Sequence, residues 1–398
     1  MYNEYFFVLD ALRADHLKYM PWLNSKINQG IYSDNYTISE GFCERMEIFT
    51  SQKPLDLGFL TAFTLENNEN YVYPYSWLNP KIAKILTFFE FNTFFTKVLR
   101  RILWEICSFC SDFPIYPQRI PLNILNKVGI TEDSIDFEKF SIINKQGLIY
   151  KLKKKGFKIE WSLFTSLSSR TYINDSQRLN TLLKYKAKNK LFIPIYISAP
   201  DKYGHKFGPN SPELIKSLNK LDKELEKVIK DLLKTNKNSG LTFIGDHGMD
   251  LIQDSINIDD IILKIENFTG LKRFIDFDFF LDSTILRVWW KGSNEKKIIF
   301  FNHLKENEEM IKKGHFFDPT NSTEINNDFV GIADFIWWAK KGIIIKPDFF
   351  HKIDEKLTGM HGYLEIDHPS NGFFLRIKQR IIDKKYKNIK SRSLDEFF

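Results

Sequence analysis

The sequence predicts an α/β fold with a mainly parallel central sheet flanked by helices. Residues 191–199 and 241–245 are almost wholly apolar, as expected for parallel strands that are buried on both faces. Between them, residues 211–234 repeat apolar positions every three or four residues and open with Ser-Pro-Glu, which predicts an amphipathic helix. A strand, an amphipathic helix and a second strand in this order form the repeating unit of a parallel sheet.

Other segments add to this frame. Residues 5–9 predict the first strand and 157–164 another, and a helical stretch after the first strand ends near Gly30. After Phe274 the chain becomes rich in aromatic, strand-like runs, which predict a smaller mixed or antiparallel region.

Residues 71–130 differ from the rest of the chain because they are aromatic-rich, helical in period and bracketed by prolines. We interpret them as a helical cap inserted within a single domain that covers residues 1–398. Lys84, Glu90, Asn92 and Lys97 interrupt the apolar run too often for it to span a bilayer. A buried or dimer-forming helix is the simpler reading, and contact with a membrane surface is the alternative.

Composition limits the partners and the compartment. The net charge is +7 for 398 residues and the lysines are dispersed, so we expect mild attraction for an anionic substrate and no nucleic-acid binding. Three cysteines are too few for a disulfide framework, and the first residues lack the pattern of a secretory signal. The sequence therefore predicts a cytoplasmic protein.

Six candidate ligand residues lie in short glycine-rich contexts near predicted strand ends. Three carboxylates and three imidazoles form a suitable donor set for a pair of divalent cations, and ligands from distant segments meet at the strand ends of open α/β sheets. The six are Asp10, Asp201, His205, Asp246, His247 and His361.

Local spacing constrains how these residues would meet. Asp201 and His205 can reach one cation if the backbone curls at Gly204. Asp246 and His247 are adjacent, and neighbours in an extended strand point to opposite faces. We therefore expect the chain to turn at this point, next to Gly245 and Gly248.

Four motifs carry a family resemblance. They are VLDALRADHL with Ala11 where a glycine is usual, DKYGHKFGP from Asp201, GDHGM from Gly245, and HGY from His361. Together they resemble the type I phosphodiesterase / nucleotide pyrophosphatase family of the alkaline phosphatase superfamily. The resemblance implies an alkaline-phosphatase-like fold and two divalent cations, zinc first and manganese as the alternative.

The resemblance also divides the ligands between the two cations. One cation would be held by Asp10, Asp246 and His247, and the other by Asp201, His205 and His361.

The attacking group is less well defined by the sequence. The family places a Thr, Ser or modified Cys at a helix N-terminus, nine positions before the Thr of a T-G-x-x-P turn. Thr50 begins the corresponding turn here, and nine positions earlier stands Gly41, which has no side chain. Cys43 is the predicted nucleophile, with Ser39 or a metal-bound hydroxide as alternatives. Arg45 could bind a substrate phosphate oxygen.

These features predict a metal-dependent hydrolase of the phosphodiesterase or pyrophosphatase type that acts on a small phosphate ester. A phosphoryl transferase acting on a glycan or lipid is one alternative. A metal-binding protein without catalytic activity is another, because the usual nucleophile position is Gly41.

Overall fold

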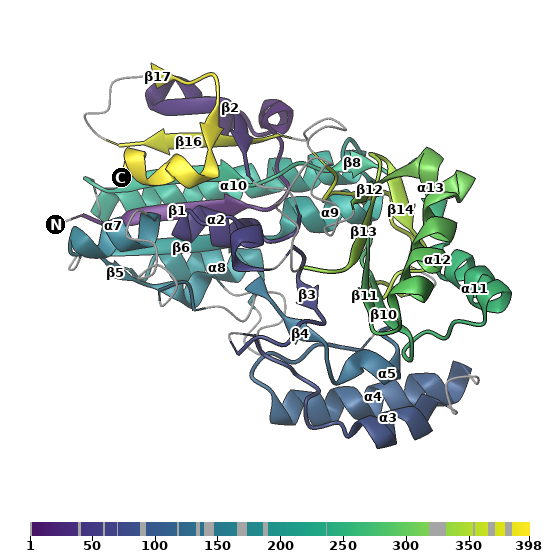
Figure 1. Cartoon of the computed structure of the whole chain (residues 1–398). Coiled ribbons are helices and arrows are strands. Elements are labelled where there is room, and N and C mark those ends of the chain that lie inside the picture. Colours follow the sequence, from purple (N-terminus) through teal and green to yellow (C-terminus); the bar gives the residue numbers. More distant parts are fainter. Residues whose placement is uncertain are drawn as a thin grey trace.

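A computed structural model describes most of the chain (Figure 1). The described residues are 2–38, 41–58, 60–69, 71–87, 93–117, 119–132, 136–138, 147–164, 173–185, 190–235, 237–317, 332–352, 355–364, 371–378 and 384–398.

The largest element is an eight-stranded sheet with the order β17-β2-β16-β7-β1-β6-β5, in which β18 also pairs with β2. β1, β5, β6 and β7 run parallel to one another, whereas β16 is antiparallel to both of its neighbours. The predicted mainly parallel sheet is therefore confirmed. The strands are β1 (Glu4–Leu9), β2 (Ile31–Thr37), β5 (Lys158–Ile159), β6 (Leu191–Ile197), β7 (Gly240–Gly245), β16 (Gly372–Ile377), β17 (Lys384–Lys385) and β18 (Ile389–Lys390).

Helices cover both faces of this sheet because alternate strand residues point to opposite sides. Phe7 of β1 packs in a cluster with α10, α8 and α1 on one face, whereas Phe6 packs with α2, α7 and the 3-10 helix η9 on the other. The three layers are seen in Figure 1. The helices are α1 (Pro21–Asn24), α2 (Glu44–Thr50), α7 (Leu148–Lys154), α8 (Asp175–Leu182), α10 (Pro212–Thr235) and η9 (Ser391–Phe397).

Two predicted boundaries need correction. The 157–164 segment contributes only the two-residue strand β5, because Trp161–Leu163 form a 3-10 helix. The segment after Leu191 leaves the strand at Ile197, and helix α9 (Ala199–Phe207) begins two residues later, with Pro200 in its first turn. The stretch before Gly30 is a series of short helices, η1 (Ala14–Tyr19), α1 and η2 (Ile27–Gln29).

A second, antiparallel sheet confirms the predicted smaller β region. Its order is β10-β11-β13-β12, and α11, α12 and α13 accompany it. Shorter two-stranded pairs are β14-β9, β15-β8 and β3-β4. The bounds are β3 (Phe63–Thr64), β4 (Gly129–Ile130), β8 (Asp250–Leu251), β9 (Asp254–Ile256), β10 (Phe277–Leu281), β11 (Ile285–Trp290), β12 (Gly314–Phe317), β13 (Phe335–Ala339), β14 (Ile343–Ile345), β15 (Gly359–Met360), α11 (Ile258–Thr269), α12 (Asn294–Lys305) and α13 (Glu308–Lys313).

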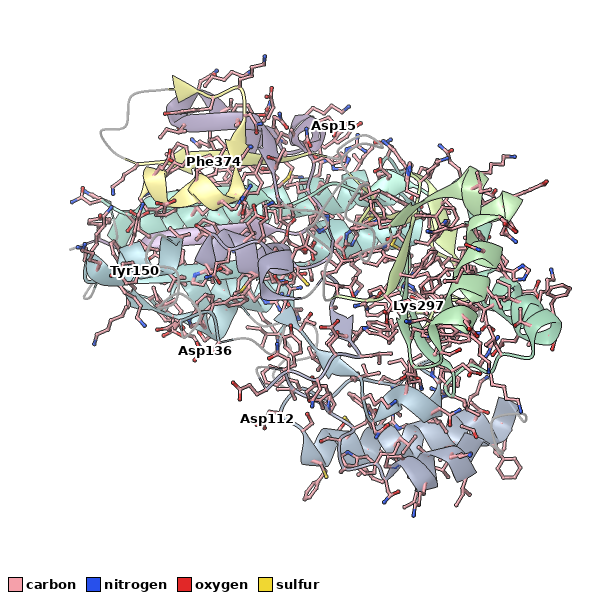
Figure 2. The ribbon with its side chains drawn as sticks, in the orientation of Figure 1. Asp15, Asp112, Asp136, Tyr150, Lys297 and Phe374 are labelled. Atoms are coloured by element: carbon pink, nitrogen blue, oxygen red, sulfur yellow. The ribbon has the colours of Figure 1, made fainter. Side chains whose placement is uncertain are left out.

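The predicted insertion forms a helical layer at one edge of the molecule, below β3 and β4 in Figures 1 and 2. It consists of α3 (Pro80–Leu86), α4 (Thr93–Cys110) and α5 (Leu122–Leu125). Leu103 and Cys107 on the inner side of α4 join the same apolar core as Phe277 of β10. The layer therefore packs against the second sheet rather than against the central one.

Candidate metal centre

The six predicted ligand residues gather beyond the carboxyl ends of the central parallel strands. Asp10 directly follows β1, Asp246 directly follows β7, and α9, which carries Asp201 and His205, follows β6. Because β1 lies between β6 and β7 and all three are parallel, these segments emerge at the same edge. His361 reaches the edge from β15, which pairs with β8 just after β7.

The first donor group consists of Asp201, His205 and His361, whose ligand atoms lie within 4.8 Å of one another. Asp201 Oδ1 is 3.0 Å from His205 Nε2 and 3.6 Å from His361 Nε2. His205 Nδ1 lies 2.9 Å from the carbonyl oxygen of Gly359. Since a carbonyl can only accept, Nδ1 carries the proton and Nε2 keeps its lone pair for a cation.

Helical spacing brings Asp201 and His205 together, not a backbone curl at Gly204 as predicted. The two residues are four apart on α9, so they share one face of the helix. Gly204 serves packing instead, because a Cβ there would lie 3.1 Å from the side chain of Met249. The missing side chain lets α9 approach the segment that follows β7.

The second donor group consists of Asp10, Glu44, Asp246 and His247, also within 4.8 Å of one another. His247 Nε2 is 3.2 Å from Asp10 Oδ1, 3.5 Å from Glu44 Oε1 and 3.9 Å from Asp246 Oδ1. The Tyr196 hydroxyl donates to Asp10 Oδ2 and fixes its orientation.

Backbone geometry holds Asp246 in place. Its Oδ1 accepts from the N–H of His247 at 2.9 Å and from the N–H of Ala11 at 3.0 Å. Ala11 has a φ of 56°, a left-handed conformation that costs a non-glycine residue about 1–2 kcal/mol. The residue that replaces the family's glycine therefore adopts a conformation that favours glycine. Gly245 is required for close approach, because a Cβ there would lie 1.8 Å from the carbonyl oxygen of Leu12.

The two groups adjoin each other. The rings of His247 and His361 stack with centroids 4.1 Å apart, and the ring of His205 lies 5.1 Å from that of His361. The structure thus places the six predicted residues in two neighbouring groups with the same membership as the resemblance implies.

The electrostatics of this centre fit divalent cations. Burial raises the pKa of Asp246 well above its usual value, with the His247 charge opposing and the carboxylates of Asp10 and Glu44 reinforcing the rise. Burial lowers the pKa of His361 well below its usual value, and the nearby His247 charge adds to this. Three carboxylates in one buried group need positive charge beside them, which His247 supplies when protonated and a bound divalent cation would supply in its place.

Orphaned atoms point the same way. Among the described residues, Asp246 Oδ2 is buried with no hydrogen-bond partner, and Asp201 Oδ1 and His247 Nε2 face only other members of the two donor groups. Buried polar atoms in proteins are almost always satisfied, so these three are suited to a ligand role. The donor set, carboxylate oxygen and imidazole nitrogen without thiolate, suits zinc.

Glu44 is the site residue that sequence reasoning missed. It is the first residue of α2 and only 7% exposed, and its carboxylate faces His247. Burial opposes the charge of Glu44, but the hydrogen bond and charge of His247 outweigh it and lower the pKa. The available signal was an acidic residue at a helix start, where the family places its nucleophile.

The predicted nucleophile does not lie among the donors. Cys43 is buried, and its Sγ lies 3.7 Å from Thr131 Oγ1 in a small apolar cluster with Met46 and Tyr71. Burial and the Glu132 charge raise the pKa of this thiol well above its usual value, so it is neutral. This geometry does not support Cys43 as the attacking group. The alternative, Ser39, lies outside the described residues.

The backbone at Gly41, the position where the family carries its nucleophile, disfavours any residue with a side chain. Its φ is 110°, and a Cβ there would lie 2.3 Å from the carbonyl oxygen of Leu60. Any other residue would be strained on this backbone, and the donor that the start of α2 provides is Glu44.

Arg45 lies beside the centre rather than within it. Its Nε is 3.6 Å from Glu132 Oε2, and its guanidinium lies over the ring of Tyr196 at 5.3 Å from the centroid. It also lines a cavity that begins next to Phe42, whose ring is 5.1 Å from that of His361. The guanidinium is therefore placed at the border between the donors and this cavity.

Comparison with known proteins agrees with the geometry. The family described as type I phosphodiesterase / nucleotide pyrophosphatase matches residues 150–364, just over half of the chain. The chain belongs to this family. The matched region contains the first donor group together with Asp246 and His247 of the second.

Curated relatives match a shorter segment. The chain is 42% identical to the venom phosphodiesterase of Naja atra over 94 residues, which is 23% of this chain and 10% of the relative. It is 38% identical to venom phosphodiesterase 2 of Crotalus adamanteus over 81 residues, 19% of this chain and 10% of the relative. The match thus spans only a tenth of either relative's length.

Solved structures match the whole chain in fold. Murine ectonucleotide pyrophosphatase/phosphodiesterase 5, an inactive form in complex with AMP, aligns with a TM-score of 0.59 and 15% identity over 100% of this chain and 94% of that chain. The human protein of the same name aligns with a TM-score of 0.60. These likenesses confirm the alkaline-phosphatase-like fold. The names of the relatives refer to venom and ectoenzymes, which does not support the cytoplasmic location predicted from the sequence.

Proposed function

We propose that this protein is a metal-dependent hydrolase that cleaves phosphate esters at the two donor groups. The observation that carries the proposal is the pair of adjoining groups, with imidazole rings stacked between them, in a member of the phosphodiesterase family. Zinc is the proposed metal, and manganese is the alternative.

The first donor group would hold one cation and the second donor group would hold the other. When bound, they supply positive charge that stabilises both the attacking and the leaving oxygen of an in-line displacement at phosphorus. The chain's own residues prepare this arrangement. Gly359 fixes the tautomer of His205, and Tyr196 and the Ala11 N–H orient Asp10 and Asp246.

Glu44 is proposed as the fourth ligand of the second group. Its carboxylate stands at the first residue of α2 and faces His247 Nε2 at 3.5 Å. The four carboxylates of the two groups then balance the four positive charges of two divalent cations. The substrate phosphate must therefore find additional positive charge in the protein, and Arg45 is the nearest candidate.

The proposed substrate is a small phosphate ester. Murine ectonucleotide pyrophosphatase/phosphodiesterase 5, which has the same fold, was solved with AMP. We propose further that the helical layer of α3 and α4 contacts a membrane surface.

The test is hydrolysis of bis-p-nitrophenyl phosphate by the full chain after chelation and after refilling with zinc or manganese. We expect negligible turnover of the chelated protein and recovery on refilling. Elemental analysis should give two metals per chain. A protein that binds two metals yet hydrolyses neither diesters nor monoesters would instead be the non-catalytic binder.

A further inference from the structure

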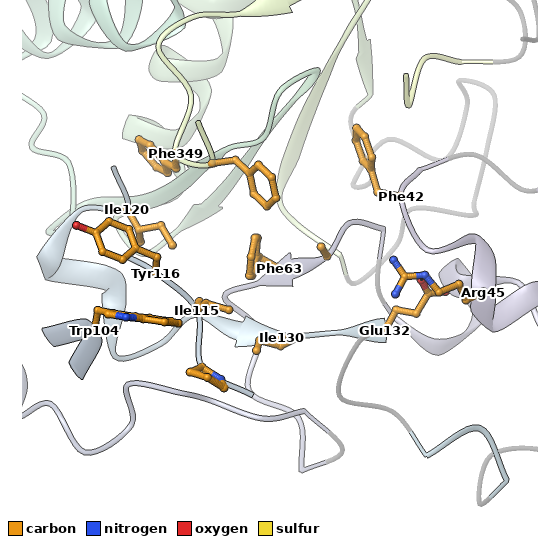
Figure 3. A pocket seen from close by; sticks show the side chains of 13 residues that line it. Phe42, Arg45, Phe63, Trp104, Ile115, Tyr116, Ile120, Ile130, Glu132 and Phe349 are labelled. Carbon is orange, nitrogen blue, oxygen red and sulfur yellow. The ribbon is translucent and has the colours of Figure 1, made fainter. Parts of the chain in front are cut away.

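A cavity extends from residues beside the metal centre to the helical layer. It has a volume of about 360 Å³ and thirteen lining residues (Figure 3). At one end lie Phe42 and Arg45, beside the donor groups, and at the other lie Trp104 of α4 and Tyr116. The sequence predicted the metal centre but not this cavity. The proposed hydrolysis does not use the end of the cavity at Trp104 and Tyr116.

Two lining residues, Phe42 and Arg45, place this end of the cavity beside the donor groups. The Phe42 ring lies edge-on to the ring of His361, with centroids 5.1 Å apart. Arg45 directly follows Glu44, the first residue of α2. A molecule whose phosphate occupies the donor groups could therefore extend past Phe42 and Arg45 into the cavity.

The lining favours an aliphatic occupant. Of the lining residues only Arg45 and Glu132 are charged, and they pair with each other at the end nearest the donors. Phe63 and Ile115 line the middle with apolar side chains (Figure 3), and Ala62 is also among the lining residues. A nucleobase would bury several donors and acceptors that need partners, whereas an alkyl chain needs none.

The outer side of the same helical layer is unusually apolar for an exposed surface. Phe94 and Phe109 of α4 are 69% and 88% exposed, and Ile85 of α3 is 59% exposed. We call this set the apolar face; its members are Ile82, Ile85, Phe94, Phe95, Val98, Ile102, Ile106 and Phe109. Soluble helices normally turn charged residues outward, and large exposed apolar patches mark interaction sites.

The basic residues of α3 and α4 favour an anionic surface as the partner of the apolar face. Lys81, Lys84, Lys97 and Arg101 are exposed on α3 and α4, against the single exposed acidic residue Glu105 in these two helices. Basic and aromatic residues together on an amphipathic helix suit the surface of an anionic membrane. Among the described residues, no helix is both long enough and apolar enough to cross a membrane.

We propose that α3 and α4 dock on an anionic membrane and that the cavity behind them receives the aliphatic chain of a phosphate ester drawn from that membrane. Trp104 lines the cavity from α4, the helix that carries most of the apolar face. The cavity would then lie about one helix diameter, some 10 Å, from the membrane surface. This inference rests on the proposed function, because it assigns the substrate's phosphate to the donor groups.

The cavity is tested with alkylphosphonates, which the enzyme cannot hydrolyse at phosphorus because a P–C bond replaces the ester. Calorimetry on the zinc-loaded chain should show affinity rising by up to about fourfold for each buried CH₂ from methyl- to octylphosphonate. Ile115→Phe and Ala62→Phe, which fill the cavity, should remove this dependence. Ile311→Phe, at an exposed position on α13, is the matched control and should keep it.

Equal affinity for methyl- and octylphosphonate would overturn the cavity assignment. So would AMP binding that is tighter than octylphosphonate binding and equally weakened by Ile115→Phe, since the cavity would then be a nucleobase site. Neither measurement depends on turnover. Failure here is therefore distinguishable from failure of the proposed function, which is judged by zinc-dependent hydrolysis of a short chromogenic ester.

Docking is tested by co-sedimentation with vesicles of phosphatidylcholine containing phosphatidylserine, and with phosphatidylcholine alone. We expect binding to the anionic vesicles that falls about tenfold or more in the double variant Phe95→Glu, Phe109→Glu. Phe268→Glu, which alters an equally exposed phenylalanine on α11, should bind as the wild type. No binding at low salt, or a stable dimer in solution that the double variant dissociates, would overturn the membrane assignment.

Discussion

The two donor groups differ in their ligand chemistry. The first combines one carboxylate with two imidazoles, whereas the second combines three carboxylates with one imidazole. Imidazole is neutral when it ligates, so the second group opposes far more of a cation's charge than the first. The difference indicates that the cation in the first group would keep more positive charge to offer a phosphate oxygen.

Local structure differs as well. Asp201 and His205 belong to one helix, so the first group is partly assembled by α9 itself. The second group draws Asp10, Glu44 and Asp246 from three separate segments, and the N–H of the strained Ala11 holds Asp246 in place. We therefore expect the second group to be more sensitive to substitutions in its surroundings.

The largest effect should come from removing one donor from each group. Asp246→Asn and His361→Ala should each lower kcat/KM for a chromogenic diester by about 1,000-fold or more, because several kcal/mol of charge stabilisation disappear. The asparagine side chain keeps an oxygen that accepts from the N–H groups of Ala11 and His247, so the Asp246→Asn protein should keep its fold. His303→Ala on α12 is the control. Activity within tenfold of wild type in either donor variant would refute the shared centre.

A smaller and more selective effect should follow from Glu44→Gln. If Glu44 is a ligand, the variant should lose affinity for one of two zinc ions by more than the roughly 10–100-fold that outer partners contribute. Competition with a chromogenic chelator measures this. Glu47→Gln is the matched control, because Glu47 is also a buried acid of α2 but faces Arg392 at 3.6 Å. Equal zinc affinity in both variants would restrict Glu44 to a structural role.

The first group could be predicted from the sequence almost completely. Asp201 and His205 were predicted to share a cation from a recognisable motif, although the structure brings them together by helical spacing on α9 and not by a curl at Gly204. The parallel strands were readable from apolar runs, so the common edge for Asp10 and Asp246 followed from topology. His361 needed the family resemblance, since its approach through the β15-β8 pair has no local signal.

Glu44 and the cavity could not be predicted in the same way. Whether an acid at a helix start faces solvent or a ligand group depends on the direction of α2 relative to His247, which is a tertiary property. Cys43 illustrates the same limit, because its neighbour in sequence faces the donors while its own Sγ faces Thr131. The cavity joins Phe42, Ile115 and Phe349 from three distant segments.

The next effect concerns Cys43. Since its thiol is buried and faces Thr131, Cys43→Ala should keep turnover within about threefold and lose about 1 kcal/mol of unfolding free energy. Steady-state kinetics and urea denaturation measure the two quantities. A loss of turnover of 100-fold or more, with both zinc ions retained, would restore Cys43 as the nucleophile.

The smallest effect should come from Ala11→Gly. Glycine relieves the left-handed strain of about 1–2 kcal/mol at φ 56°. It also removes a buried methyl group, and the greater entropy of the unfolded chain lowers the unfolding free energy by about 0.4–1 kcal/mol. These contributions nearly cancel, so the unfolding free energy should change by less than about 1 kcal/mol and zinc affinity should not change.

Ala11→Val sharpens the comparison, because a β-branched residue at this φ is a severe outlier. The valine backbone would have to rotate and withdraw its N–H from Asp246. Zinc affinity in the second group should then fall while the first group, which has no contact with Ala11 among the described hydrogen bonds, keeps its own. Equal losses from both groups would mean that they form one rigid unit rather than two that can be perturbed separately.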